Sequence, residues 1–120
     1  MDPIETGKRR VKNFQTADFE TLERLDGKTS GASILQLDSS AAPGVGFHLY
    51  RLEPGASSEP HEHSCNEQFV VLQGSLLDHD GIQYREGDFV WLEAGTRHSS
   101  YSPDGCLLAV YFETAAKTLA

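Results

Sequence analysis

The sequence predicts a small all-β domain, a sandwich or barrel of short strands. Two observations carry this prediction. Short apolar runs rich in β-branched and aromatic residues are spread through residues 34–112. Eleven glycines and five prolines separate these runs, and turn signals recur about every ten residues, as in small β-sandwiches and barrels. With 120 residues, the chain is long enough for one domain with one modest core.

The expected strands follow one another between these turns. Asp80-Gly81 lies between apolar flanks, the pattern of a tight hairpin. Residues 14–30 fit either a strand with a turn or one helical turn. We divide the chain into an N-terminal arm with the first strand or strands (1–32), a barrel (33–113) and a C-terminal tail (114–120), which is either a short helix or irregular. The expected barrel strands are 34–37, 47–52, 68–73, 75–78, 82–84, 89–92, 98–101 and 106–112.

Charge and composition exclude several partners. The formal charge is −8, so the surface repels a phosphate backbone, and the basic residues 8–12 are interpreted as a solvated arm. We therefore expect no nucleic-acid partner. No apolar run reaches membrane-spanning length, and the N-terminus lacks an apolar leader. Two cysteines do not make a disulfide framework, so the expected location is cytoplasmic, without a membrane partner.

One segment concentrates the metal-binding chemistry. His61, His63 and Glu67 lie within seven residues and form the mixed nitrogen and oxygen donor set that holds divalent transition ions. Two histidines at positions i and i+2 of a strand point to the same face. Glu67 opens an apolar run, where a buried carboxylate needs a partner. His98, which follows a glycine turn, is the candidate fourth ligand. We expect one Fe, Zn, Ni or Mn ion.

Other candidate donors fit the pattern less well. His79 lies in the expected hairpin turn and should be exposed. His48 lies in a strand without a paired donor, which favours packing or solvent contact over ligation. Cys65 lies between the expected ligands and could bind as a thiolate, but its short-turn context favours a bystander role.

These residues resemble the first conserved motif of the cupin superfamily. The pattern Gly55-x5-His61-x-His63-x3-Glu67-x6-Gly74 matches at every fixed position. The second motif matches at Gly87, Gly95 and His98, whereas Glu93 replaces the usual proline and Ser102 the usual asparagine. The resemblance implies a double-stranded β-helix, or jelly-roll barrel, with His61, His63, Glu67 and His98 as ligands.

Further short segments resemble a subgroup. Residues 78–81, 84–88, 95–98 and 102–106 are similar to the cupin domain of ChrR-type anti-sigma factors and to small acetylacetone-cleaving dioxygenases. The resemblance implies an oxygenase-like enzyme, of the kind of an Fe(II)-dependent dioxygenase, that acts on a small dicarbonyl substrate. The alternatives are a metal-binding sensor or regulatory module, or a metal-free structural cupin. Cupins commonly pair through sheet edges or N-terminal strands, so the expected assembly is a homodimer.

The enzyme interpretation assigns roles to several side chains. Glu67 would be a displaceable or charge-tuning ligand, and Tyr50 and Arg97 are candidate substrate anchors. Four apolar residues are either pocket wall or plain core: Phe69, Val71, Phe89 and Trp91.

Overall fold

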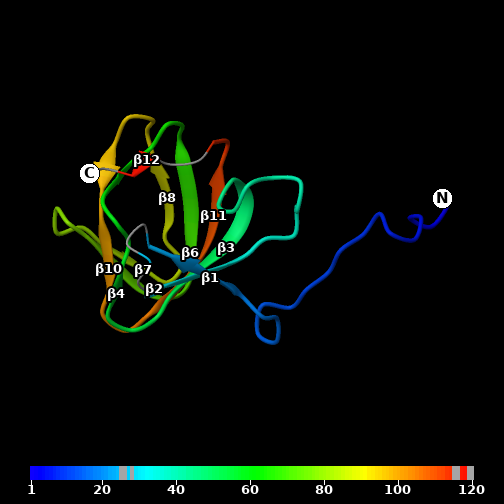
Figure 1. Ribbon diagram of the computed structural model, residues 1–120, viewed down its shortest axis with the longest axis horizontal. Coiled ribbons are helices and arrows are strands. Elements are labelled where there is room, and N and C mark those ends of the chain that lie inside the picture. Colours follow the sequence, from blue (N-terminus) through cyan, green and yellow to red (C-terminus); the bar gives the residue numbers. More distant parts are fainter. Residues whose placement is uncertain (25–26, 28, 115–116, 119–120) are drawn as a thin grey trace.

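The computed structural model is an all-β barrel with a long N-terminal arm (Figure 1). It describes residues 1–24, 27, 29–114 and 117–118, and this part of the chain contains no helix. The jelly-roll architecture expected from the sequence is confirmed. The strands are β1 (Glu20–Glu23), β2 (Thr29–Leu35), β3 (Gly46–Leu52), β4 (Ala56–Ser57), β5 (His61–Glu62), β6 (Glu67–Asp78), β7 (Gln83–Arg85), β8 (Phe89–Leu92), β9 (Arg97–His98), β10 (Ser100–Ser102), β11 (Cys106–Phe112) and β12 (Lys117–Thr118).

The long strand β6 lies at the centre of the larger sheet. The strand order of this sheet is β1-β2-β3-β11-β6-β10-β4, and β7 and β8 also pair with β6. The first half of β6 pairs with β8 and β11, and the second half with β7 and β10. The sheet thus curls around its own inner face. A second, three-stranded sheet of order β12-β5-β9 lies at one end, and we call its strands β5 and β9 the rim strands.

The inner face of the curled sheet holds the core. Side chains alternate along each strand, so one face of β3, β6 and β11 is apolar and buried. This core includes Leu52, Phe69, Val71, Leu108 and Val110, each no more than 4% exposed. Leu52, Phe69, Leu108 and Val110 also line a cavity that reaches His61 and His98 on the rim strands.

The second half of β6 begins where the β6–β11 register shifts. The shift falls between Leu107 and Leu108, and Gly74 follows with a φ of +76°. A Cβ on Gly74 would lie 2.1 Å from the carbonyl oxygen of Gly105, so only glycine allows this close approach. The strand can therefore bend and serve both halves of the barrel.

The expected local elements can now be compared with the structure. Asp80-Gly81 forms the β6–β7 hairpin, as predicted. Within residues 14–30, a turn at Asn13–Ala17 precedes β1. β12 pairs with β5, so the described part of the tail contains a strand instead of the short helix considered above. β2 crosses residue 33, where the sequence division begins the barrel.

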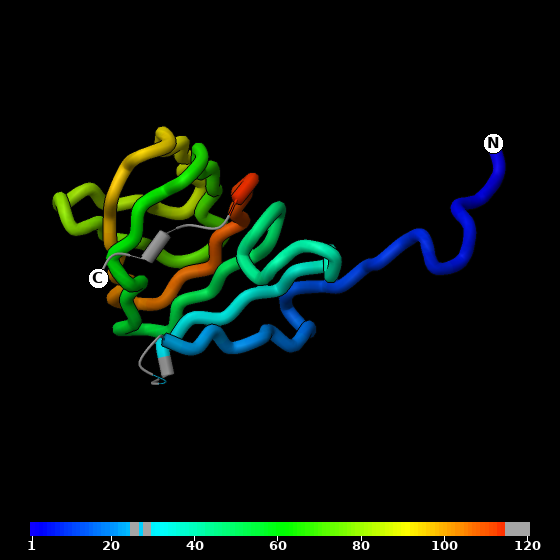
Figure 2. The backbone as a smooth tube through the Cα atoms, turned by 45° about the horizontal axis from the view of Figure 1, so that its top comes forward, coloured from blue at the N-terminus to red at the C-terminus, as the bar shows by residue number. Residues whose placement is uncertain are grey.

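The first residues of the chain reach away from the barrel (Figure 2). The guanidinium of Arg10 donates to the carbonyl oxygen of Leu37 at 2.6 Å and to Ser39 Oγ at 3.2 Å. Ile4 and Val11 are exposed. A helix long and apolar enough to cross a membrane does not occur among the described residues.

Candidate metal centre

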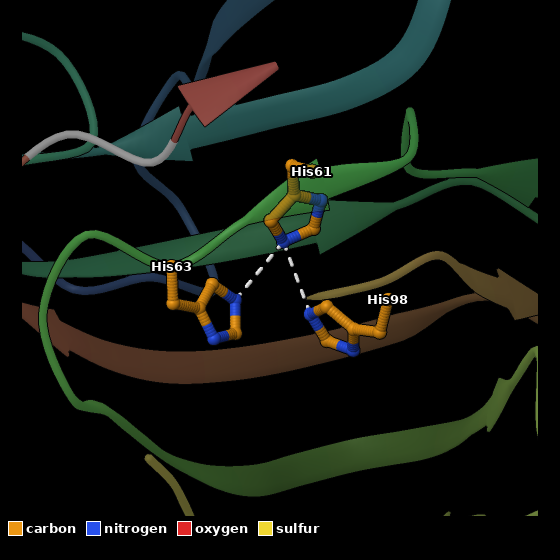
Figure 3. A group of neighbouring side chains, drawn as sticks. All are labelled: His61, His63 and His98. Atoms are coloured by element: carbon orange, nitrogen blue, oxygen red, sulfur yellow. Dashed lines mark hydrogen bonds between the residues drawn. The ribbon is translucent and has the colours of Figure 1, made fainter. Parts of the chain in front are cut away.

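Three histidines converge at the open end of the barrel (Figure 3). His61 lies on β5 and His98 on β9, and the two residues face each other in the antiparallel register. The next pair of that register, Glu62 and Arg97, forms an ion pair at 2.9 Å on the opposite face. His63 follows β5, so its side chain returns to the side of His61. The alternation expected from His61-x-His63 therefore brings the imidazoles together.

The Nε2 atoms of the three rings are the atoms that meet. His61 Nε2 lies 3.1 Å from His63 Nε2 and 3.0 Å from His98 Nε2, the contacts drawn as dashed lines in Figure 3. His63 is only 1% exposed. The rings cross at 47° to 76° with centroids 4.5–5.0 Å apart, so they point at a common centre and do not stack.

Each Nδ1 atom has its own hydrogen-bond acceptor. His61 Nδ1 lies 2.7 Å from the carbonyl oxygen of Glu59, and His98 Nδ1 lies 3.1 Å from Asp78 Oδ2. His63 Nδ1 lies 3.1 Å from Thr96 Oγ1. The Thr96 hydroxyl already donates to the carbonyl of Glu93, so its oxygen accepts from His63. All three Nδ1 atoms must therefore carry the hydrogen.

This tautomer leaves three lone pairs pointing at one another. A neutral imidazole with hydrogen on Nδ1 offers only an acceptor at Nε2, and acceptors about 3 Å apart repel one another. A shared proton or a metal ion between them removes the repulsion. Histidine ligands of metals commonly donate their second N–H to a carbonyl or carboxylate in this way, so the group fits a metal ion.

The spacing also indicates the arrangement of the donors. Nitrogens about 2.1 Å from one ion lie about 3.0 Å apart at right angles and about 3.4 Å apart at the tetrahedral angle. The two observed separations, 3.1 Å from His61 to His63 and 3.0 Å from His61 to His98, match the right-angle value. Three protein donors would leave positions for other ligands on a six-coordinate ion, as in non-haem Fe(II) sites.

Glu67 opens β6 beside this group and is 7% exposed. Its Oε1 lies 3.4 Å from His63 Nε2 and 3.8 Å from His98 Nε2. These distances put the carboxylate next to two of the three donors. The three imidazoles remain the most compact set, with all donor atoms within 4.8 Å of one another.

The electrostatics of the group differ from residue to residue. Burial lowers the pKa of His61, and burial together with the charges of His98 and His61 lowers the pKa of His63 to about 4. Burial, with a smaller effect of Asp78, raises the pKa of Glu67 to about 7. Burial alone would lower the pKa of His98, but its hydrogen bond to Asp78 and the charge of that carboxylate raise it. In the metal-free protein, His98 and Glu67 are therefore the groups of the site whose pKa values are raised.

A cavity of about 260 Å³ adjoins the histidines. His61, His98 and Glu67 form part of its wall, and Arg24 and Glu59, an ion pair at 3.5 Å, line it as well. The volume lies just below the range of drug-sized pockets, so the cavity suits a small organic molecule. The rest of the wall has a larger apolar part and a smaller polar part. The apolar part is formed by Leu22, Ala32, Leu52, Phe69, Leu76, Leu108, Val110 and Phe112, and the polar part by Glu23, Ser30, His48, Tyr50, Ser57, Ser58 and Ser100.

The candidate substrate anchors lie in different places. Tyr50 lines the cavity, and burial first, then the charges of Cys106 and Glu67, raise the pKa of its hydroxyl, which stays a neutral donor. The Arg97 side chain is 67% exposed and pairs with Glu62. The alternation of β9 explains this, because His98 takes the inward position and its neighbour must face outward.

The candidate wall residues also divide between faces. Phe69 lines the cavity, and Val71 is buried in the core beyond it. Phe89 and Trp91 are 79% and 56% exposed, so the expectation that they form wall or core was wrong. Val90 and Leu92 take the inward positions of β8 and pack against the core instead. Cys65 contacts the backbone of Thr114 and is not part of the histidine group.

The acceptors of the histidine N–H groups were not found by sequence reasoning. Asp78 appeared only as the end of an expected strand and in a segment of the subgroup resemblance, yet its carboxylate accepts from His98, Tyr84 and Ser100. The available signal was a carboxylate at one end of a buried strand. Glu67, at the other end of the same strand, was found by this signal. Thr96 is the other side chain, and Glu59 acts through its backbone, which no residue pattern can reveal.

The barrel and its converging histidines define a cupin with a candidate metal site. The family model of the ChrR cupin-like domain matches residues 12–116, and the chain belongs to this family. The sequence resemblance is thereby confirmed. No curated protein matches the chain.

Several solved structures share the fold. A putative acetylacetone dioxygenase from Methylibium petroleiphilum PM1 is 14% identical with a TM-score of 0.75, and the match covers 99% of this chain and 86% of that one. The polyketide cyclase RemF from Streptomyces resistomycificus is 17% identical with a TM-score of 0.69, covering 93% and 86%. The complex of Rhodobacter sphaeroides SigE with the anti-sigma ChrR matches at 18% identity and a TM-score of 0.64, covering 88% of this chain and 50% of that one. At these identities the likeness shows the fold alone.

The first prediction concerns Asp78. We expect Asp78→Asn to weaken Zn(II) binding by about ten- to a hundredfold, because the amide removes the charge that holds His98 in its binding tautomer. The dissociation constant is measured at pH 7.5 by competition with a chromophoric chelator. Asp80→Asn is the matched control, because Asp80 accepts only the backbone N–H of Ile82 in the exposed turn and asparagine accepts it equally well. Equal affinities of the two variants would contradict the assignment.

The second prediction concerns pH. Protons compete with a metal at His98, whose pKa is raised, and at Glu67, whose pKa is about 7. Lowering the pH protonates both groups, so Zn(II) affinity should fall by roughly tenfold or more between pH 7.5 and 5.5. Isothermal titration calorimetry in buffers of different ionisation enthalpy would also detect the released protons. An affinity that stays constant over this range would exclude both groups as competing sites.

Proposed function

We propose that this cupin is a metal-dependent, oxygenase-like enzyme that acts on a small dicarbonyl-type substrate. The observation that carries the proposal is the group of three Nε2 donors, two of them 3.0 and 3.1 Å from His61 Nε2, beside a small, largely apolar cavity. His61, His63 and His98 would hold the Fe(II), which would supply Lewis-acid and redox chemistry for a substrate in the adjoining cavity. The acetylacetone dioxygenases among the structural neighbours support the substrate class.

The side chains around the cavity suit this chemistry. Tyr50 offers a hydroxyl donor to a carbonyl oxygen of the substrate. Glu67, with its pKa raised to about 7, can give or take a proton near neutral pH, or act as a fourth ligand. The apolar wall excludes water from the reacting groups.

Oxygen uptake tests the proposal. The Fe(II)-loaded protein should consume dioxygen with acetylacetone or a related small β-dicarbonyl, in step with loss of the dicarbonyl absorbance. The His61→Ala/His63→Ala variant should show no uptake, since it lacks two donors. We expect Tyr50→Phe to lower kcat/KM by about five- to tenfold, the effect of one lost hydrogen bond. No uptake above that of the metal-free protein across a broad dicarbonyl panel would overturn the oxygenase proposal.

A sensing module is the second candidate function. The family is named after the cupin-like domain of ChrR, and one structural neighbour is the complex of the anti-sigma ChrR with SigE. The first residues of the arm, which precede the contact of Arg10 with Leu37 and Ser39, reach away from the barrel and offer a surface for a partner. Tightly held Zn(II), no turnover, and a partner lost on deletion of the arm would favour this function. Two free cysteines, Cys65 and Cys106, are consistent with a reducing cytoplasm, where we place either function.

We also propose that the protein is a homodimer. The outer face of the large sheet carries four exposed aromatic side chains on neighbouring strands: Phe47 on β3, Tyr111 on β11, and Phe89 and Trp91 on β8. Tyr111 is the register partner of Phe47 and of Gln68, which in turn pairs with Trp91. At 42–79% exposure, the four rings leave about 400–600 Å² open. This is over half of the roughly 800 Å² per partner in a standard interface, and the arm with Ile4 and Val11 offers further apolar area.

Light scattering after size exclusion tests the dimer. We expect Trp91→Lys to yield a monomer, because it puts two unpaired charges at the centre of a two-fold contact. Ile82→Lys is the matched control, because Ile82 is 53% exposed on the β6–β7 hairpin and should remain dimeric. A monomer mass for the unsubstituted protein at high concentration would contradict the proposal.

A further inference from the structure

His48 is a buried polar residue that the metal centre does not use. It lies on β3, is only 4% exposed, and lines the cavity. The Phe112 ring lies between His48 and the metal centre, with centroids 6.2 Å from the His48 ring and 5.5 Å from the His63 ring. His48 therefore belongs to the cavity but lies outside the group of ligands.

The structure fixes which nitrogen of His48 carries the hydrogen. Nδ1 lies 3.1 Å from the carbonyl oxygen of Gly46, which can only accept, so Nδ1 is the donor. Burial lowers the pKa of His48, and the ring is neutral at pH 7. Nε2 then bears a lone pair. Among the described residues, no hydrogen bond to His48 Nε2 is found.

Such an acceptor can take a hydrogen bond from a molecule in the cavity. The described residues include no buried side-chain nitrogen or oxygen without a partner, so Nε2 keeps its access to the cavity, and the neighbouring wall around Phe69, Val110 and Phe112 consists of apolar side chains. Tyr50, two residues further along β3, points to the same face and supplies a hydroxyl. The pair thus presents one acceptor and one donor to a molecule in the cavity.

We propose that His48 is a ligand-binding residue whose Nε2 accepts a hydrogen bond from a hydroxyl group of the cavity ligand. The ligand class is then a small, uncharged hydroxyketone or enol, with its carbonyl oxygen within the reach of Tyr50. The proposal deepens the proposed function and rests on it only in placing the ligand in the same cavity. It requires binding and no turnover.

A matched pair of probes tests the assignment. 4-Hydroxy-2-butanone and 2-pentanone have the same number of heavy atoms and differ by a hydroxyl in place of a methyl group. Each is titrated into Zn(II)-loaded protein labelled with ¹⁵N-histidine, and the His48 ring resonances are followed by NMR. His48→Gln identifies those resonances. His48→Phe removes the acceptor and keeps a ring of similar size, and its metal content and melting temperature report on folding.

The outcomes are distinct. We expect the hydroxyketone to bind about five- to tenfold more tightly than 2-pentanone and to shift the His48 Nε2 resonance towards the hydrogen-bonded position. In His48→Phe the two probes should bind equally, and His48→Gln should retain part of the preference. An unchanged preference in folded His48→Phe, an unmoved Nε2 resonance on saturation, or no binding of either probe overturns the proposal. If the preference is found and oxygen uptake is absent, the oxygenase function fails and the role of His48 stands.

Discussion

The convergence of three Nε2 atoms, with His61 Nε2 about 3 Å from the other two, is the constraint on which the site depends. It is possible only because each ring has its hydrogen on Nδ1, and each Nδ1 has an acceptor from a different part of the chain: the Glu59 backbone, the Thr96 hydroxyl and the Asp78 carboxylate. The pairing of β5 with β9 then sets His61 opposite His98. The fold therefore holds the three imidazoles in place without an ion. Their Nε2 lone pairs repel one another in this arrangement, and a bound ion would remove that repulsion.

Asp78 connects this constraint to the body of the barrel. It ends β6, the strand that pairs with β7, β8, β10 and β11. Its carboxylate accepts from Tyr84 and Ser100 as well as from His98. Burial would raise the pKa of Asp78, but these three hydrogen bonds lower it overall. The Asp78 carboxylate is thus kept ionised inside the protein, where it orients the candidate ligand His98 and raises the basicity of that imidazole.

The sequence predicted the features that depend on residue type and local spacing. It did not predict which side chains face inward where the register between strands determines this. The strand pattern and the motif around His61 and His63 predicted the barrel and the imidazole cluster, because alternation along a strand is a local property. The facing of Phe89 and Trp91 depends on how β8 aligns with β6, which a single segment does not encode. For the same reason, Arg97 was an equal candidate to Tyr50 until the β5–β9 register turned it outward.

The shortness of the rim strands has a consequence of its own. β5 and β9 have two residues each, so few backbone hydrogen bonds hold the segments that carry His61 and His98. An ion bound by these residues would tie both rim strands to one point. Metal binding and the ordering of the rim strands would then be coupled in one equilibrium. Hydrogen exchange of the rim amides would therefore slow as the site fills, and it would measure metal occupancy indirectly.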